Sequence, residues 1–320
     1  MPILITDSDV EQLVDMQECI KVMENALLQV PSGLAWNERS SQIRTPKGFY
    51  TVLQGAVLSS GVVGLKVYTA RFPSGSRFLT VLHDSETGDL LALLQGRLCT
   101  QLRTGAMTAV ATQYMARKDS GTAGIIGTGI QARMQLESIC AIRQIHTIKT
   151  YDIIPDRART FSVQMSNLLD IPVLPVESAQ ECVNNVDIVI TSTTAPEPVL
   201  LGAWLKPGMH VNSIGGGHMS KGEVDVHAIR LADTVVVEDL NDARKSYADL
   251  IHATEQGALA WEHVNDLPSV VAGKVSVRSC SSAITLFESH GIAISDVAIA
   301  EYLYRKAIEK GQGTELPLEA

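Results

Sequence analysis

The chain opens with a helical pattern. Apolar residues recur at helical intervals from Met16 to Leu27. Asp15 and Glu18 have the spacing of a capping box, in which each side chain bonds to the backbone N–H of the other residue. The pattern therefore predicts a helix that begins at Met16.

Short strand-like segments follow this helix. Residues 48–57, 62–69 and 78–96 are short apolar runs, and the last contains a hairpin turn at Thr87 and Gly88. Residues 100–116 then have the pattern of a helix. Antiparallel strands combined with helices predict an α+β arrangement for this part of the chain.

After Ser120 strands and helices alternate with short connections. In chain order the segments are strand 122–127, helix 131–142, strand 145–152, helix 156–169 and strands 186–193, 209–216 and 233–239. This alternation predicts an α/β, doubly wound parallel sheet. An amphipathic helix follows after Ser295, and its periodicity does not decide which domain it joins. A chain of 320 residues is expected to form two domains.

A glycine motif lies between the strand at 122–127 and the helix that follows it. Gly127, Gly129 and Ala132 form G-x-G-x-x-A. The first glycine permits a tight turn, the second lets a pyrophosphate approach the backbone, and the alanine keeps helix and strand close. The helix N-terminus then offers N–H groups to phosphate oxygens. The predicted dinucleotide-binding residues are Gly127, Thr128, Gly129, Ile130, Gln131 and Ala132.

Asp152 ends the next strand, 25 residues after Gly127. A carboxylate at this place accepts hydrogen bonds from the adenosine ribose and repels a 2′-phosphate, so we expect NAD(H) rather than NADP(H). Arg157 and Arg159 follow it, and we expect them on a solvated helix face. Flavin is the alternative ligand for such a loop, but flavin proteins usually carry it at the N-terminus.

Composition and charge exclude several other classes of partner. The net charge is −9 and the pI about 5.4, which argues against nucleic acid and anionic membrane surfaces. The chain has no apolar run of membrane-spanning length, and the first residues do not form a secretory leader. Five single cysteines without C-x-x-C, and histidines without ligand spacing, predict neither disulfides nor a metal site. We therefore expect a cytoplasmic protein.

Two basic residues lie among apolar neighbours in the first domain. Lys66 is either a desolvated lysine that binds a carboxylate or transfers a proton, or a lysine on the exposed face of its strand. Arg103 either clamps a carboxylate or lies on the surface near a helix end. Arg39 and Arg44 belong to a polar loop, where their positions alone favour solvation.

One histidine follows a glycine-rich strand end. Residues 209–216 form a predicted strand that leads into Gly217 and His218. Ligands bind at the carboxyl ends of such strands, which makes His218 a candidate acid or base. The alternative is a solvent-exposed loop histidine.

These motifs together resemble the ornithine cyclodeaminase/mu-crystallin family. The resemblance covers nearly the whole chain and rests on GLKVYT, QLRTGAMTAVATQYMARKDS, GIIGTGIQA, DIVITSTT, MHVNSIGG and AITLFESHGIAISDVAIA, in family order. It implies a substrate and dimerisation domain of residues 1–118, completed by the C-terminal helix 296–320, and a Rossmann NAD-binding domain of residues 119–295. It also implies a homodimer formed through the sheet of the first domain.

The resemblance further implies roles for individual residues. Lys66 and Arg103 resemble the pair that holds the substrate carboxylate, and Arg39 matches a further family arginine better than its rival Arg44. The remaining implied cofactor contacts are Thr104 and Arg103 toward the pyrophosphate, Thr193 toward the adenosine, and Ser289 and Gly291 toward the nicotinamide carboxamide.

The chain departs from the family at one position. Cyclodeaminases and the archaeal alanine dehydrogenase have an aspartate where this chain has Gly217, followed by His218. Nearby Glu223 resembles a different, structural position. Imine reduction needs only a hydride and one proton, whereas cyclodeamination makes heavier acid–base demands. We therefore expect a reductase of cyclic imines such as pyrroline-2-carboxylate, or an L-amino acid dehydrogenase of the alanine type. The alternatives are an ornithine or lysine cyclodeaminase and a nicotinamide-dependent binding protein like mu-crystallin.

Overall fold

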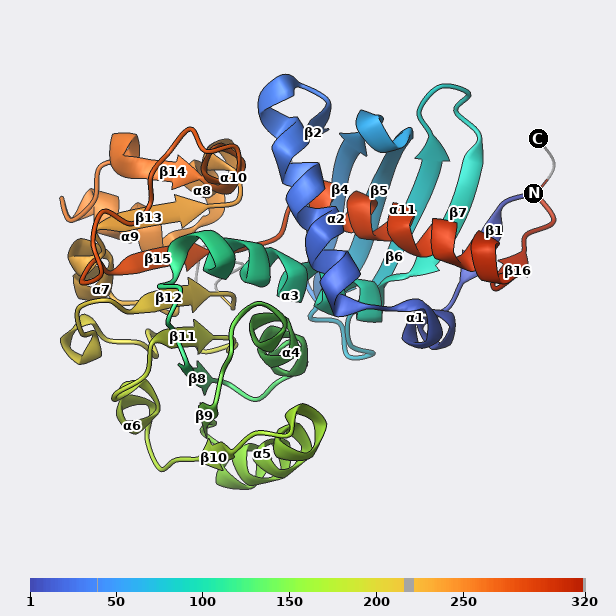
Figure 1. The fold of residues 1–320 in the computed structure, drawn as a ribbon. Coiled ribbons are helices and arrows are strands. Elements are labelled where there is room, and N and C mark those ends of the chain that lie inside the picture. The colour runs from blue at the N-terminus through green and yellow to red at the C-terminus, as the bar shows by residue number, and fades with distance from the viewer. Residues whose placement is uncertain (39, 216–221, 319–320) are drawn as a thin grey trace. The chain divides into compact units, whose positions relative to one another are not determined.

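The computed structural model describes residues 1–38, 40–215 and 222–318. The chain divides into two compact units, unit 1 with residues 1–107 and 292–320, and unit 2 with residues 108–291 (Figure 1). The first division falls inside helix α3 (Gly96–Met115) and not in the loop after it, where the sequence places the boundary.

Unit 1 contains a mixed sheet. Its strands run in the order β16-β1-β7-β6-β5-β4-β2, with β3 paired to β4. The β1–β7 pair is parallel and the other pairs are antiparallel. Gly88, at φ +80°, lies in the turn between β6 and β7, which confirms the predicted hairpin. The strands are β1 (Ile3–Ile5), β2 (Ala35–Asn37), β3 (Ser41–Thr45), β4 (Gly48–Val57), β5 (Val62–Ala70), β6 (Arg77–Asp84), β7 (Leu90–Gln95) and β16 (Thr314–Glu315).

Helices α1 (Asp7–Leu13), α2 (Met16–Gln29) and α11 (Ala293–Lys310) complete this unit (Figure 1). Helix α11 packs on β4, β5 and β6 and against α2. It begins at Ala293, so Ser295 lies inside the helix and does not precede it.

The predicted start of α2 is confirmed, but its capping box is wrong in one half. The Asp15 side chain accepts from the N–H groups of Gln17 and Glu18, as an N-cap residue does. The Glu18 carboxylate instead accepts from the Tyr302 hydroxyl at 2.7 Å and pairs with Lys306. It therefore links α2 to α11.

Two glycines let α11 approach the sheet closely. A Cβ added at Gly55 on β4 would lie 2.9 Å from the Ala293 Cβ. One added at Gly64 on β5 would lie 2.6 Å from the Val81 carbonyl oxygen and 3.2 Å from a methyl group of Val297. Larger residues would push the helix away from the strands. The first turns of α11 are thus held directly over β4 and β5.

Unit 2 contains a doubly wound sheet in which every pair is parallel, as the sequence predicts. The order is β10-β9-β8-β11-β12-β15-β13-β14. Its elements are β8 (Thr122–Ile126), α4 (Ala132–Ile142), β9 (Thr147–Tyr151), α5 (Pro155–Leu169), β10 (Val173–Pro175), α6 (Ala179–Val183), β11 (Ile188–Thr191), β12 (His210–Ser213), α7 (Val226–Leu231), β13 (Thr234–Val237), α8 (Leu240–Ser246), α9 (Ala248–Glu255), β14 (Val264–Asp266), α10 (Leu267–Val271) and β15 (Thr285–Glu288). Short 3₁₀ turns occur at Val30–Ser32, Leu58–Ser60, Gly202–Trp204 and Trp261–His263.

Both faces of this sheet are buried. Ile188 and Ile190 of β11 belong to one apolar cluster, and Val189 between them belongs to a second cluster on the opposite face. The strand order reverses between β8 and β11, where ligands bind such sheets. Among the described residues, no helix is both long and apolar enough to cross a bilayer.

Candidate active site

A buried cluster of charges lies in unit 1. The Lys66 ammonium is 2.9 Å from Oδ1 of Asp296, and Nε of Arg103 is 3.3 Å from the same oxygen. The exposed fractions are 1% for Lys66, 8% for Arg103 and 2% for Asp296. The alternatives of an exposed lysine and a surface arginine are therefore wrong. Sequence reasoning did not identify Asp296.

Strand alternation places Lys66 on the face of the sheet that carries α11. Its cross-strand partners are Leu53 on β4 and Thr80 on β6, both buried. Its ammonium lies 5.3 Å from the centre of the Phe78 ring and 5.8 Å from that of Tyr68. Aromatic faces attract a desolvated cation. Lys66 is thus enclosed by aromatic rings as well as by its counter-ion.

The environment of Lys66 shifts its protonation. Burial is the largest effect and lowers the pKa of Lys66 from 10.5 to about 8, Asp296 opposes this shift, and Arg103 adds to it. At neutral pH the ammonium is still mostly charged. The group is therefore suited both to holding an anion and to releasing a proton near physiological pH.

The other sequence candidates in unit 1 either form hydrogen bonds with residues outside this cluster or lie outside the described residues. Arg44 lies on exposed strand β3, where its Nε donates to Gln42. Thr104 lies buried on α3 and donates to the Thr100 carbonyl at 2.7 Å. Arg39 lies outside the described residues. Its predicted role therefore stays a prediction.

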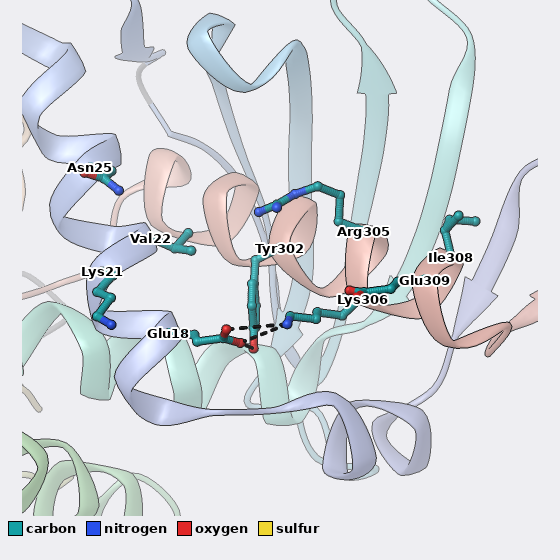
Figure 2. Close-up of a pocket in the computed structure, with 9 residues that line it drawn as sticks. All are labelled: Glu18, Lys21, Val22, Asn25, Tyr302, Arg305, Lys306, Ile308 and Glu309. Carbon is teal, nitrogen blue, oxygen red and sulfur yellow. Dashed lines mark hydrogen bonds and ion pairs between the residues drawn. The ribbon is translucent and has the colours of Figure 1, made fainter.

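A separate hollow of about 490 Å³ lies between α2 and α11 (Figure 2). Glu18 points to Tyr302 and Lys306 there, and hydrogen bonds from both lower the pKa of the Glu18 carboxyl. Arg305 bonds to Glu301. Glu18 and Lys306 already pair with each other there, and none of the cluster residues lines the hollow. We do not assign the active site to this hollow.

The glycine motif of unit 2 has the geometry of a cofactor loop. Gly127 follows β8 with φ +95°, and a Cβ on it would lie 2.5 Å from the Ser192 carbonyl oxygen. A Cβ on Gly129 would meet nothing within 4 Å, so its backbone faces open space. No side chain caps α4, which begins at buried Ala132. These features suit a pyrophosphate that approaches Gly129 and the helix N-terminus.

Asp152 lies directly after β9 and beside this loop. Its Oδ2 accepts from the Thr128 N–H and hydroxyl, and its Oδ1 accepts from the Ile154 N–H at 2.9 Å. A carboxylate accepts about four hydrogen bonds, which leaves capacity for a ribose hydroxyl. Burial opposes ionisation, but the bonds from Ile154 and Thr128 prevail and lower the pKa of Asp152. The charged carboxylate disfavours a 2′-phosphate.

The two arginines downstream of Asp152 do not alter that expectation. Arg157 is exposed on α5. Arg159 pairs with Asp156 at 2.8 Å, and 61% of its side chain is exposed. Both lie on a solvated helix face, as the sequence predicts.

Glu223 joins two loops at the carboxyl edge of the sheet. It is 1% exposed and accepts from the N–H groups of Thr193 and Gly215, each at 2.6 Å, and from the Thr191 hydroxyl. These loops follow β11 and β12, which places Thr193 at this edge. Glu223 therefore has a structural role, whereas Gly217 and His218 lie outside the described residues.

A second buried acid holds the segment after β15. Glu238 accepts from the Ser289 hydroxyl, from the N–H groups of His290 and Gly291, and from the Tyr247 hydroxyl. It thereby fixes the segment that the resemblance assigns to the nicotinamide. The sequence signal was weak, because Glu238 looks like an ordinary acid at a strand end.

Sequence reasoning also missed a buried acid–base pair at this edge. Nε2 of His290 is 3.0 Å from Oε1 of Glu288, and its ring stacks on Tyr247. Burial, aided by Glu223, raises the pKa of Glu288 to about 8, and burial lowers that of His290 to about 4. Near pH 7 the His290 ring is therefore neutral and the Glu288 carboxyl is mostly protonated. Among the described residues, no group of three or more His, Cys, Asp or Glu could hold a metal ion.

Comparisons with known proteins agree with this geometry. The Delta(1)-pyrroline-2-carboxylate reductase of Bacillus cereus is 31% identical over 98% of this chain and 99% of its own length. The alanine dehydrogenase of Archaeoglobus fulgidus is 31% identical over 98% of both.

Solved structures of the same two kinds of enzyme are similar to this chain. Delta(1)-pyrroline-2-carboxylate reductase of Thermococcus litoralis, in complex with NADH and L-proline, superimposes with a TM-score of 0.94, at 36% identity over 98% of this chain and all of the other. An archaeal alanine dehydrogenase dimer with bound NAD has a TM-score of 0.93, at 30% identity over 99% of both chains. The model of the ornithine cyclodeaminase/mu-crystallin family matches residues 2–311, and the chain belongs to that family.

Proposed function

We propose that this protein is an NAD(H)-dependent oxidoreductase that reduces a C=N bond alpha to a carboxylate. A pyrroline-2-carboxylate-type imine is the preferred substrate, and an L-amino acid such as proline is the product. The Lys66–Arg103–Asp296 cluster carries the proposal, because two cations and one carboxylate leave a net charge of +1 in a buried place. The reductase and dehydrogenase relatives that match almost the whole chain support it.

Each component of the reaction has a candidate residue. NADH, when bound, would supply a hydride to the imine carbon, and a proton must also reach the nitrogen. Lys66 and Arg103 bind the substrate carboxylate by charge-assisted hydrogen bonds. Lys66, with a pKa of about 8, is also the proton donor that we favour. His218 stays a candidate for relaying that proton, and Arg39 or Arg44 for completing the carboxylate site.

NADH absorbance after mixing with pyrroline-2-carboxylate tests this function. We expect rapid oxidation of NADH, and slower oxidation of NADPH because of the Asp152 carboxylate. Pyruvate with ammonia, run in parallel, tests alanine-type chemistry. If neither substrate is reduced and ornithine releases ammonia with the cofactor unchanged, the protein is a cyclodeaminase and the proposal fails.

We further propose that the working form is a cytoplasmic homodimer. The face of the unit 1 sheet opposite α11 is apolar and stays partly exposed in the single chain. Its half-buried residues include Val52, Leu65, Val67, Leu79, Val81 and Leu93. The archaeal alanine dehydrogenase neighbour was solved as a dimer, which supports this choice of partner. The five cysteines are all free, in keeping with a reducing compartment.

Val81→Glu is expected to convert the dimer to a monomer, because it places a charge at the centre of that apolar face. Val163→Glu is the matched control, since Val163 is 64% exposed on α5 of unit 2. Sedimentation velocity of both variants and the wild type measures the effect. A dimeric Val81→Glu variant or a monomeric wild type would contradict the proposed interface.

A further inference from the structure

We propose that Asp296 is the positioning residue of the basic cluster. Its Oδ1 holds the Lys66 ammonium beside the Arg103 guanidinium and leaves the three groups with a net charge of +1, which matches one substrate carboxylate. The inference rests on the proposed function, because it assumes a substrate that carries a carboxylate.

A single oxygen of Asp296 serves both cations. Oδ1 lies 2.9 Å from Nζ of Lys66 and 3.3 Å from Nε of Arg103. Lys66 comes from β5, Arg103 from α3 and Asp296 from α11, so the oxygen is the point at which three elements meet. Two like charges this close repel each other unless an anion lies between them. Asp296 supplies that anion.

The cluster is not a self-sufficient structural ion pair. Among the described residues, the buried Oδ2 of Asp296 has no hydrogen-bond partner, and the buried Nε of Arg103 has only its ion pair with Oδ1 of Asp296. Buried polar atoms without partners are uncommon in native proteins and mark places that await a ligand or a rearrangement. The uncompensated positive charge also indicates a ligand site, because a buried net charge is costly until an anion binds.

The fold delivers Asp296 to this place. It lies in the first turn of α11, where the helix dipole stabilises a carboxylate. Gly55 and Gly64 allow that turn to lie directly on the strands, and Lys66 is two residues from Gly64 on β5. The cluster therefore depends on how closely helix and sheet pack.

Three charged or titratable groups act on Lys66 among the described residues. Asp296 on α11 raises the pKa of Lys66 and Arg103 on α3 lowers it, whereas the Cys99 thiol on α3, whose own pKa is raised by burial, is uncharged and contributes little. Because Asp296 is the strongest of the groups that oppose burial, its loss must lower that pKa below about 8. Lys66 would then lose its charge at a pH where the wild-type residue is still protonated.

Asp296→Asn tests the proposal, because it removes the charge and keeps the shape. The alkaline fall in kcat should move about 1–2 pH units lower, within the usual effect of one neighbouring charge. The ratio of the variant and wild-type KM values for pyrroline-2-carboxylate should be roughly tenfold or more at about pH 8 and close to unity at about pH 5.5. A merely structural role would raise this ratio equally at both pH values and leave the pH profile unmoved, which would overturn the proposal.

Glu301→Gln is the matched control. Glu301 lies on the same helix and is 8% exposed, but it pairs with Arg305. Its amide variant should reproduce the wild-type pH profile. If Glu301→Gln shifted the pH profile as much as Asp296→Asn does, the loss of any negative charge from α11 would be enough to cause the shift. The specific role of Asp296 would then be wrong.

A second measurement does not depend on turnover. The pKa of a buried lysine can be lower in the folded protein than in the unfolded chain. Between these two pKa values the unfolded chain binds the extra proton, so the folded state becomes more stable as the pH rises. The folded pKa of the wild-type residue is about 8, so that gain begins near that pH. In Asp296→Asn this rise in stability should begin at a lower pH than in the wild type. Adding Lys66→Met to Asp296→Asn should abolish the rise. Thermal midpoints measured between about pH 6 and 8 test both expectations. If no imine is reduced but this shift is found, the proposed function fails and the role of Asp296 toward Lys66 stands. If the shift is absent, the role of Asp296 fails.

Discussion

Lys66→Met is expected to lower kcat/KM for a pyrroline-2-carboxylate-type imine by about 10²–10⁴-fold, the usual contribution of one positioned acid. The methionine keeps the apolar stem but removes the ammonium. Arg103 and Asp296 are then left as a neutral pair, so the net charge that attracts the substrate carboxylate is lost. NADH affinity should stay close to that of the wild type, because the dinucleotide loop belongs to unit 2.

Lys306→Met is a closely matched control for this prediction. Lys306 belongs to the same unit, pairs with Glu18 at 3.2 Å and lies 5.9 Å from the Tyr302 ring centre. It thus has an acid and an aromatic ring as neighbours, like Lys66, but it lies near the C-terminal end of α11, whereas Asp296 lies in the first turn. Steady-state kinetics and NADH fluorescence titration measure both variants. Activity of Lys66→Met within about tenfold of the wild type would remove Lys66 from the mechanism.

Gly127→Ala is expected to damage both the fold of unit 2 and NADH binding. At φ +95° a side chain is strained by about 1–3 kcal/mol, and its Cβ would lie 2.5 Å from the Ser192 backbone oxygen. The loop between β8 and α4 must then move, so the thermal midpoint should fall and the Kd for NADH should rise at least about tenfold.

Gly129→Ala separates cofactor approach from folding. Because its Cβ meets nothing within 4 Å, the variant should keep the wild-type thermal midpoint and still weaken NADH binding. Differential scanning calorimetry and NADH titration report the two effects. Normal NADH affinity in Gly129→Ala would show that the pyrophosphate does not approach this glycine, and the cofactor site would need to be placed elsewhere.

Periodicity and turn chemistry predicted the elements that have strong local signals. The predicted strand at 48–57 and hairpin turn at Gly88 are found, because alternating apolar residues and a turn glycine are local features. Strand β15 was missed, although Thr285–Glu288 is buried on both faces like the predicted strands β11 and β12. Its place between β12 and β13 depends on the whole sheet.

The site was predictable in its residue types but not in its pairings. Lys66 and Arg103 stood out as basic residues among apolar neighbours, yet their common partner is 230 positions from Lys66. In the sequence Asp296 has the appearance of an ordinary acid in the first turn of a helix. Glu18 illustrates the opposite case, since its capping spacing was correct but its carboxylate bonds to Tyr302. Long-range packing decides such partners, and no local pattern records it.

The most direct measurement follows deuterium from NADH labelled at nicotinamide C4 into the product of pyrroline-2-carboxylate reduction. Both C4 epimers of the labelled cofactor should be used, because only one of the two positions is transferred. We predict proline with deuterium at the carbon alpha to the carboxylate, since the hydride adds to the imine carbon while a proton from the protein or water joins the nitrogen. Proline without deuterium from either epimer, or no proline at all, would contradict the account.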